Sequence, residues 1–164
     1  MLWHEVDFSK IIKTLTPRGG YEVKYDNGPL KFQIPLGNCK YGLNSFTNDR
    51  GAVSLTINID YVEHQSFQNW FKDLETAMDI PEPFSSNLND ENLRLRIEDT
   101  TLFLNWVEQV DSLEVKEGAL RGYDLIAIIE IPAVYFFKEQ YGLTIRATQI
   151  RYKPKDPPFL FTDI

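Results

Sequence analysis

The chain has little of what catalytic and metal-binding sites usually require. Its 164 residues include one cysteine and two histidines. Cys39, His4 and His64 do not have the spacing of zinc ligands. There is no glycine-rich phosphate loop and no Gly-x-Ser-x-Gly elbow. We therefore expect no metal, no cofactor and no catalytic centre. Since one cysteine cannot form an internal disulfide, we expect an intracellular protein.

Long hydrophobic runs are also missing. The longest apolar stretch, residues 125–137, is interrupted by Glu130 and Pro132, and a membrane-spanning helix needs roughly 20 apolar residues. The N-terminal residues lack the basic and apolar regions of a secretory signal. With 43% hydrophobic residues the composition is that of a globular protein. We expect one domain over residues 1–155 and a proline-rich tail over residues 156–164.

Basic residues are in the minority. Seventeen Lys and Arg stand against 24 Asp and Glu, a net charge of −7, which disfavours a nucleic-acid partner. The acids concentrate in residues 61–99, which carry nine of them against three cations. Residues 1–50 carry seven cations against five acids, and residues 138–155 carry five against one. If the two ends meet in space, one face is basic; otherwise the charges serve only solubility.

Alternating apolar and polar residues predict β-strands over most of the chain. The pattern is clearest at 21–25 and 30–34, where the intervening Asp26-Asn27-Gly28 predicts a tight hairpin. Residues 5–16 suit either a short helix or an edge strand. Further strands are predicted at 52–60, 93–97 and 101–107, and at 123–153 as two strands joined by a turn at Tyr141-Gly142.

One segment, residues 63–79, has helical periodicity. Its large apolar residues form the stripe of an amphipathic helix that docks on the core, with Asp60 or Ser66 as the N-cap. Segments 35–51 and 84–92 are expected to be loops. The stripe consists of Phe67, Trp70, Phe71, Leu74 and Met78.

These elements favour a mainly β fold. Seven or eight short strands with a single helix do not fit a parallel doubly wound sheet, in which strands and helices alternate. They fit an OB-fold-like antiparallel barrel with one inserted helix. The OB-fold is a five-stranded Greek-key barrel that binds oligonucleotides or oligosaccharides.

Aromatic and basic side chains form the remaining candidate site. Proteins that bind single strands stack bases on aromatic rings and contact phosphates with Lys and Arg. Arg94 and Arg96 share one face of a strand, as the wall of a basic groove requires. For any single residue, an ordinary polar barrel surface is the simpler interpretation. The candidates for nucleic-acid binding are Tyr21, Lys24, Tyr25, Lys31, Phe32, Tyr41, Phe46, Arg94, Arg96, Arg146, Arg151, Tyr152 and Lys153.

Two other functions stay open. Phe159, Leu160 and Phe161 in the tail are costly to expose and could dock on a protein partner or a second copy. The chain would then be a viral structural or interaction module. An enzyme would need a carboxylate site such as Glu98-Asp99, but these two acids fall on a predicted turn and are expected to be solvated.

Two segments resemble a known family. In residues 30–46 the strand ending in Gln33-Ile34-Pro35 is followed by Tyr41-Gly42-Leu43. In residues 125–152 an isoleucine-rich strand ends in aromatics and is followed by Tyr141-Gly142-Leu143 and Gln149. This order resembles the single-stranded DNA-binding OB-fold proteins of the large nucleocytoplasmic DNA viruses, over about half of the chain. The resemblance implies non-enzymatic single-stranded DNA binding in replication, recombination or repair, inside an infected cell.

Overall fold

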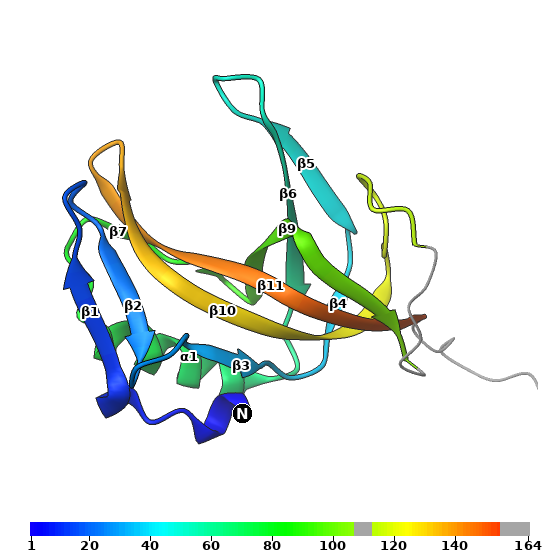
Figure 1. The fold of residues 1–164 in the computed structure, drawn as a ribbon. Helices are drawn as coiled ribbons and strands as arrows, with labels where there is room; N and C mark the ends of the chain where they lie inside the picture. Colours follow the sequence, from blue (N-terminus) through cyan, green and yellow to red (C-terminus); the bar gives the residue numbers. More distant parts are fainter. Residues whose placement is uncertain (107–112, 155–164) are drawn as a thin grey trace, which may run out of the picture.

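The computed structural model describes residues 1–106 and 113–154 (Figure 1). The predicted tail, including Phe159, Leu160 and Phe161, lies outside the described residues. No helix in the described part is long and apolar enough to cross a membrane. The elements are η1 (Trp3–Glu5), η2 (Phe8–Lys10), β1 (Ile11–Leu15), β2 (Tyr21–Tyr25), β3 (Lys31–Gln33), β4 (Gly37–Cys39), β5 (Leu43–Thr47), β6 (Val53–Asp60), α1 (Gln65–Ala77), β7 (Phe84–Ser85), β8 (Leu88–Asn89), β9 (Asn92–Asn105), β10 (Tyr123–Phe137) and β11 (Gln140–Pro154).

Five strands close into a barrel. Going round it, β10 pairs with β4, β4 with β6, β6 with β9, β9 with β11, and β11 again with β10. All of these pairs are antiparallel except β9 with β11, which is parallel. Strands β3 and β2 continue the edge of β10 beyond β4. The predicted OB-like barrel with one inserted helix is confirmed.

The core lies inside the barrel, and α1 packs against it. Phe67, Phe71 and Leu74 on α1 are completely buried, in one cluster with the inward side chains of β3, β6, β9, β10 and β11. The helical prediction is confirmed, but the N-cap is His64, whose Nδ1 accepts a hydrogen bond from the Phe67 amide at 3.3 Å. In Figure 1 α1 lies at the lower end, and the β5–β6 hairpin projects at the upper end.

The predicted hairpin between residues 21–25 and 30–34 is wrong. The turn itself forms, because Tyr25 and Gly28 exchange backbone hydrogen bonds and Asp26 takes a positive φ of 53°. In an antiparallel ladder the next hydrogen-bonded pair would be Val23 with Leu30, but the Leu30 carbonyl oxygen accepts a hydrogen bond from the Ile131 amide of β10 at 3.0 Å. The chain therefore leaves β2, and β3 pairs with β10 instead.

The turn between the last two strands also differs from the prediction. It is made by Lys138 and Glu139, with φ of 50° and 62°, the left-handed pair that suits a two-residue hairpin. Gly142 lies within β11, opposite Tyr135. The predicted loops 35–51 and 84–92 contain the short strands β4, β5, β7 and β8, and the predicted turn at 98–100 lies inside the continuous strand β9.

The alternation of buried and outward side chains along β11 is interrupted at Thr148. Before this residue Ile145 and Ala147 are buried; after it Ile150 and Tyr152 are buried. The pairings with both neighbours skip one residue at this point, which is a β-bulge. The Thr148 hydroxyl donates to the Ile128 carbonyl oxygen at 3.1 Å, so the extra residue is held in place.

Candidate nucleic-acid interface

The bulge brings the basic residues of β11 onto one surface. Simple alternation places Arg146 and Arg151 on opposite faces, because they are five residues apart. With one extra residue at Thr148, Arg146, Arg151 and Lys153 all point away from the core. We call the side of β3, β10, β11 and β9 that faces away from the core the outer sheet face.

Arg94 and Arg96 on β9 extend this surface. The parallel pairing of β9 and β11 places Arg96 directly beside Arg146. On the other side of Arg146, Glu130 of β10 is its partner in register, and the Arg146 Nε donates to the Glu130 carboxylate at 2.7 Å. The Glu130 side chain is only 16% exposed. This ion pair orients the guanidinium of Arg146 but also neutralises part of the basic surface.

The centre of the outer sheet face is apolar. Ile126 and Ile128 of β10 lie opposite Arg151 and Gln149 of β11. Together with Gln33 of β3 they line a shallow depression of about 130 Å³. An apolar floor edged by cations suits a ligand with flat apolar rings and a negatively charged backbone.

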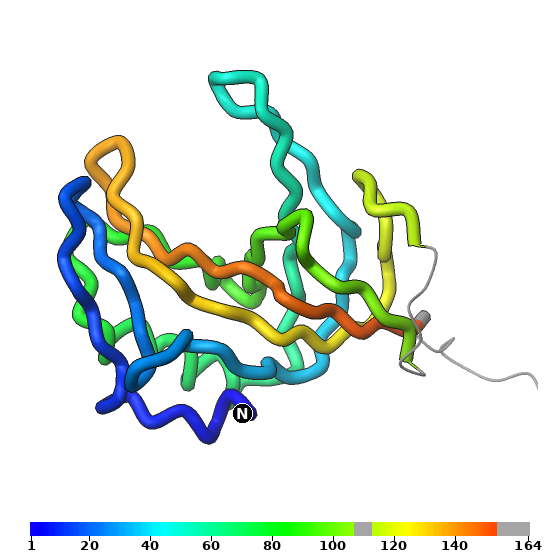
Figure 2. Tube along the Cα trace, viewed as in Figure 1, coloured from blue at the N-terminus to red at the C-terminus, as the bar shows by residue number. Residues whose placement is uncertain are grey.

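A groove opens where two hairpins project from the barrel. The β5–β6 and β10–β11 hairpins diverge upward in Figure 2, and a cavity of about 340 Å³ lies between residues from both. Phe46 of β5, 52% exposed, and Tyr135 of β10, 37% exposed, line it. Arg94 and Arg96 also line it, and no acidic residue does. We call it the Phe46–Tyr135 groove.

Gly142 allows Tyr135 to lie in this position. The two residues are direct partners across β10 and β11. A Cβ atom added at Gly142 would overlap the phenol ring of Tyr135. The missing side chain therefore leaves room for the ring to lie across the neighbouring strand.

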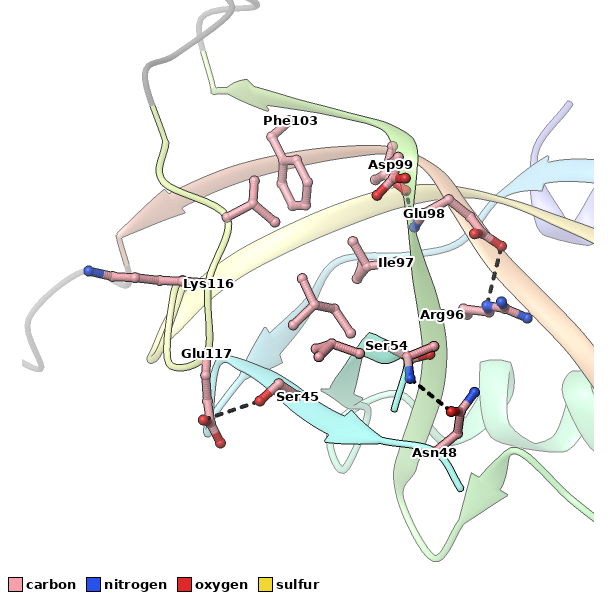
Figure 3. Close-up of a pocket in the computed structure, with 15 residues that line it drawn as sticks. Ser45, Asn48, Ser54, Arg96, Ile97, Glu98, Asp99, Phe103, Lys116 and Glu117 are labelled. Carbon is pink, nitrogen blue, oxygen red and sulfur yellow. Dashed lines mark hydrogen bonds and ion pairs between the residues drawn. The ribbon is translucent and has the colours of Figure 1, made fainter. Parts of the chain in front are cut away.

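A larger cavity, of about 700 Å³, is less suited to a polyanion. It lies between the β5–β6 hairpin, β9 and residues 115–117. Figure 3 shows Glu98, Asp99 and Glu117 among its lining residues. Glu98 is 3.4 Å from Arg96, and the Ser45 hydroxyl donates to Glu117 at 3.2 Å. Three acids in the lining would repel phosphates.

A third cavity, of about 610 Å³, surrounds the end of β6. Its lining includes the acids Asp60, Glu63 and Asp124. Lys40 already forms an ion pair here, because its Nζ lies 2.6 Å from the buried carboxylate of Asp60. This hydrogen bond raises the pKa of Lys40. Among the described residues, no group of three or more His, Cys, Asp or Glu side chains could hold a metal ion.

Six of the predicted candidates share the outer sheet face, although they come from three separate parts of the sequence. The predicted groove wall of Arg94 and Arg96 is among them. These residues are Lys31, Arg94, Arg96, Arg146, Arg151 and Lys153.

Two candidates are corrected. Phe32 and Tyr152 are 1% and 5% exposed, so no base can stack on them. Tyr152 turns inward because the bulge at Thr148 reverses the alternation, and Phe32 turns inward because Lys31 and Gln33 take the outward positions of β3. Both residues belong to the hydrophobic core.

Four other candidates lie elsewhere. Tyr21 and Tyr25 pack at the margin of the core, and the Tyr25 hydroxyl accepts a hydrogen bond from the Asp7 amide at 3.0 Å. Lys24 is 3.7 Å from Glu22. Tyr41 is exposed in the loop between β4 and β5. None of the four lines the Phe46–Tyr135 groove.

Tyr135 was missed by the sequence reasoning. It lies in the aromatic run that precedes the hairpin turn, where the sequence does not show which ring faces outward. The small residue opposite it, Gly142, is a usable signal only once the register of the hairpin is known.

No family model and no curated protein matches the chain. Its fold is similar to solved structures of the single-stranded DNA-binding protein from bacteriophage Enc34. The C-terminally truncated form aligns with a TM-score of 0.53 and 12% identity, over 92% of this chain and 99% of that one. The complex with single-stranded DNA gives 0.55 and 11%, over 92% and 98%. A third structure of the same phage protein aligns with a TM-score of 0.52 and 11% identity, over 94% of this chain and 96% of that one. At these identities the likeness shows the fold.

Proposed function

We propose that this chain is a non-enzymatic protein that binds single-stranded DNA with little sequence preference. The observation that carries the proposal is the outer sheet face. In a protein with a net charge of −7, it gathers cations from three separate strands beside an apolar floor. Phosphates would contact the cations, and bases would contact the floor and the aromatic rings of the groove.

The similar structures support this proposal. One of them is a complex with single-stranded DNA, and the likeness extends over at least 92% of this chain in all three comparisons. A barrel of this shape provides the scaffold, but function depends on the side chains it carries. The cationic outer sheet face and the Phe46–Tyr135 groove are this chain's own side chains in suitable positions.

The biological setting is a finer part of the proposal. We propose a supporting role in DNA replication, recombination or repair within a virus-infected cell. The resemblance found in the sequence is to proteins of large nucleocytoplasmic DNA viruses, whereas the similar structures are of a bacteriophage protein. The division into a domain over residues 1–155 and a tail over 156–164 stays a prediction.

The test is fluorescence-anisotropy binding of a labelled single strand of about 30 nucleotides and of its duplex. This length exceeds the roughly 4–16 nucleotides that one OB-fold covers. We expect binding that prefers the single strand and weakens as salt rises, because phosphate contacts release counterions. Absence of binding at micromolar protein and low salt would refute the proposal and favour a protein-interaction role, to be pursued by pull-down.

A further inference from the structure

Trp106 is an exposed aromatic residue at the far end of the outer sheet face. It directly follows β9 and is 42% exposed. The Nζ of Lys153 lies 4.7 Å from the centre of its ring. Lys153 itself points away from the core on β11, opposite Asp124 of β10. A tryptophan ring with a cation beside it presents a flat surface next to a charge that can hold a phosphate.

The other two tryptophans have a different environment. Trp3 and Trp70 pack edge to face with their ring centres 5.3 Å apart. Both also contact Phe67, a fully buried residue of α1. Their rings are therefore used in packing, and they stabilise the N-terminal segment on the helix. Packing of this kind does not explain why Trp106 is exposed.

Trp106 and the Phe46–Tyr135 groove lie toward opposite ends of the same strand. Thr144 of β11 lines the groove, and Lys153 is beside Trp106. The nine residue steps from Thr144 to Lys153 span about 30 Å at the usual rise per strand residue. Between the two ends, β11 presents Arg146, Gln149 and Arg151 on the outer sheet face.

We propose that Trp106 is a second base-stacking position for the single strand. This inference rests on the proposed function. The strand would follow β11 with its phosphates on the cations, one base on Trp106 and others at Phe46 and Tyr135. A path of about 30 Å holds at most about nine nucleotides at the 3.4 Å spacing of a stacked strand. That number lies within the roughly 4–16 nucleotides that one OB-fold covers.

The experiment titrates the full chain with unlabelled 30-nucleotide single-stranded DNA and monitors tryptophan fluorescence. A separate competition experiment measures the affinity by fluorescence anisotropy. Trp106→Leu should remove most of the fluorescence change and weaken binding by about 5- to 140-fold, the loss expected for one stacked base. Trp106→Phe should restore part of the affinity, because it keeps a ring. Leu15→Ala, which removes an exposed apolar side chain that lines none of the cavities described above, is the control.

The salt dependence separates stacking from charge. Trp106→Leu should leave the slope of log K against log salt unchanged, whereas Lys153→Gln should make it shallower by about 0.7, the contribution of one phosphate contact in a single strand. If wild type binds but Trp106→Leu binds equally well with the same fluorescence change, the inference is overturned and the proposed function stands. If wild type does not bind, the proposed function itself has failed. Equal melting temperatures would show that all variants are folded.

Discussion

Replacing Arg94 and Arg96 together by glutamine should reduce the salt dependence of DNA binding by an amount that the structure sets. Six cations lie on the outer sheet face. Arg146 is held by the mostly buried Glu130 at 2.7 Å, whereas the longer 3.4 Å pair of Arg96 with Glu98 is more exposed and can open to a phosphate. If each of the other five contacts a phosphate, log K should fall with log salt with a slope of about −3.5, since each contact in a single strand contributes about −0.7. The double variant should have a slope of about −2.1.

These slopes give large differences in affinity. Between 50 and 200 mM salt the wild type should lose about 130-fold in affinity and the double variant about 18-fold. The assay is anisotropy with the labelled 30-nucleotide strand at four or five salt concentrations. A double variant whose slope equals that of wild type would refute the assignment of Arg94 and Arg96 as phosphate contacts.

A matched control removes the same charge elsewhere. Arg18 lies in the loop after β1, and Arg121 lies in the turn before β10; both are exposed. Arg18→Gln with Arg121→Gln changes the net charge as much as the test variant does. Its slope should stay near −3.5 if contacts on the outer sheet face determine the salt dependence. An equal decrease in both variants would mean that only overall charge matters.

Three further outcomes follow from the structure. Gly142→Ala should displace the Tyr135 ring and weaken DNA binding as much as Tyr135→Ala does, about 5- to 140-fold. A DNA titration of the double variant should show no further loss of affinity. Additive losses of affinity would contradict the proposed coupling between the two residues. Phe71→Ala should destabilise the fold by about 3–5 kcal/mol in urea unfolding because it empties a fully buried site, while Lys72→Ala on the exposed side of α1 should change stability by no more than about 0.5 kcal/mol. Burial raises the pKa of Cys39 from 9.0 to about 11, so the thiol of the unfolded chain ionises first as pH rises, and the free energy of unfolding should fall between pH 9 and pH 11. Cys39→Ala should lack this fall. Alkylation of Cys39 at pH 8 should be slow until denaturant is added.

The long periodic segments could be predicted from the sequence. The alternation in residues 52–60 and the apolar stripe in residues 63–79 depend on local spacing alone, and both elements are present as β6 and α1. The barrel class followed from counting such elements. Partner choice could not be predicted in the same way. The ladder of the Asp26-Asn27-Gly28 turn ends at Gly28, because Leu30 bonds to Ile131 and β3 pairs with a strand about 100 residues away.

The candidate site could be predicted in part. Arg94 and Arg96 were placed correctly on one outward side of their strand, because Leu93 and Leu95 alternate with them. Their position beside Arg146 depends on a parallel pairing between distant strands, which no local pattern contains. The inward turn of Tyr152 depends on a single extra residue, which leaves no mark in the composition of β11.

That extra residue makes the length of β11 as important as its chemistry. The pairing with β10 skips Thr148, so deleting this residue would leave Ala147 and Gln149 as consecutive partners of Ile129 and Ile128, with the cations still facing outward. A one-residue insertion elsewhere in β11 would instead shift one half of the strand and turn its side chains to the wrong side. Such an insertion should therefore do more damage than the deletion of Thr148 or the loss of several residues from the β5–β6 hairpin loop. Variants designed to strengthen the interface should follow the same rule, with new cations at even-numbered positions before Thr148 and at odd-numbered positions after it.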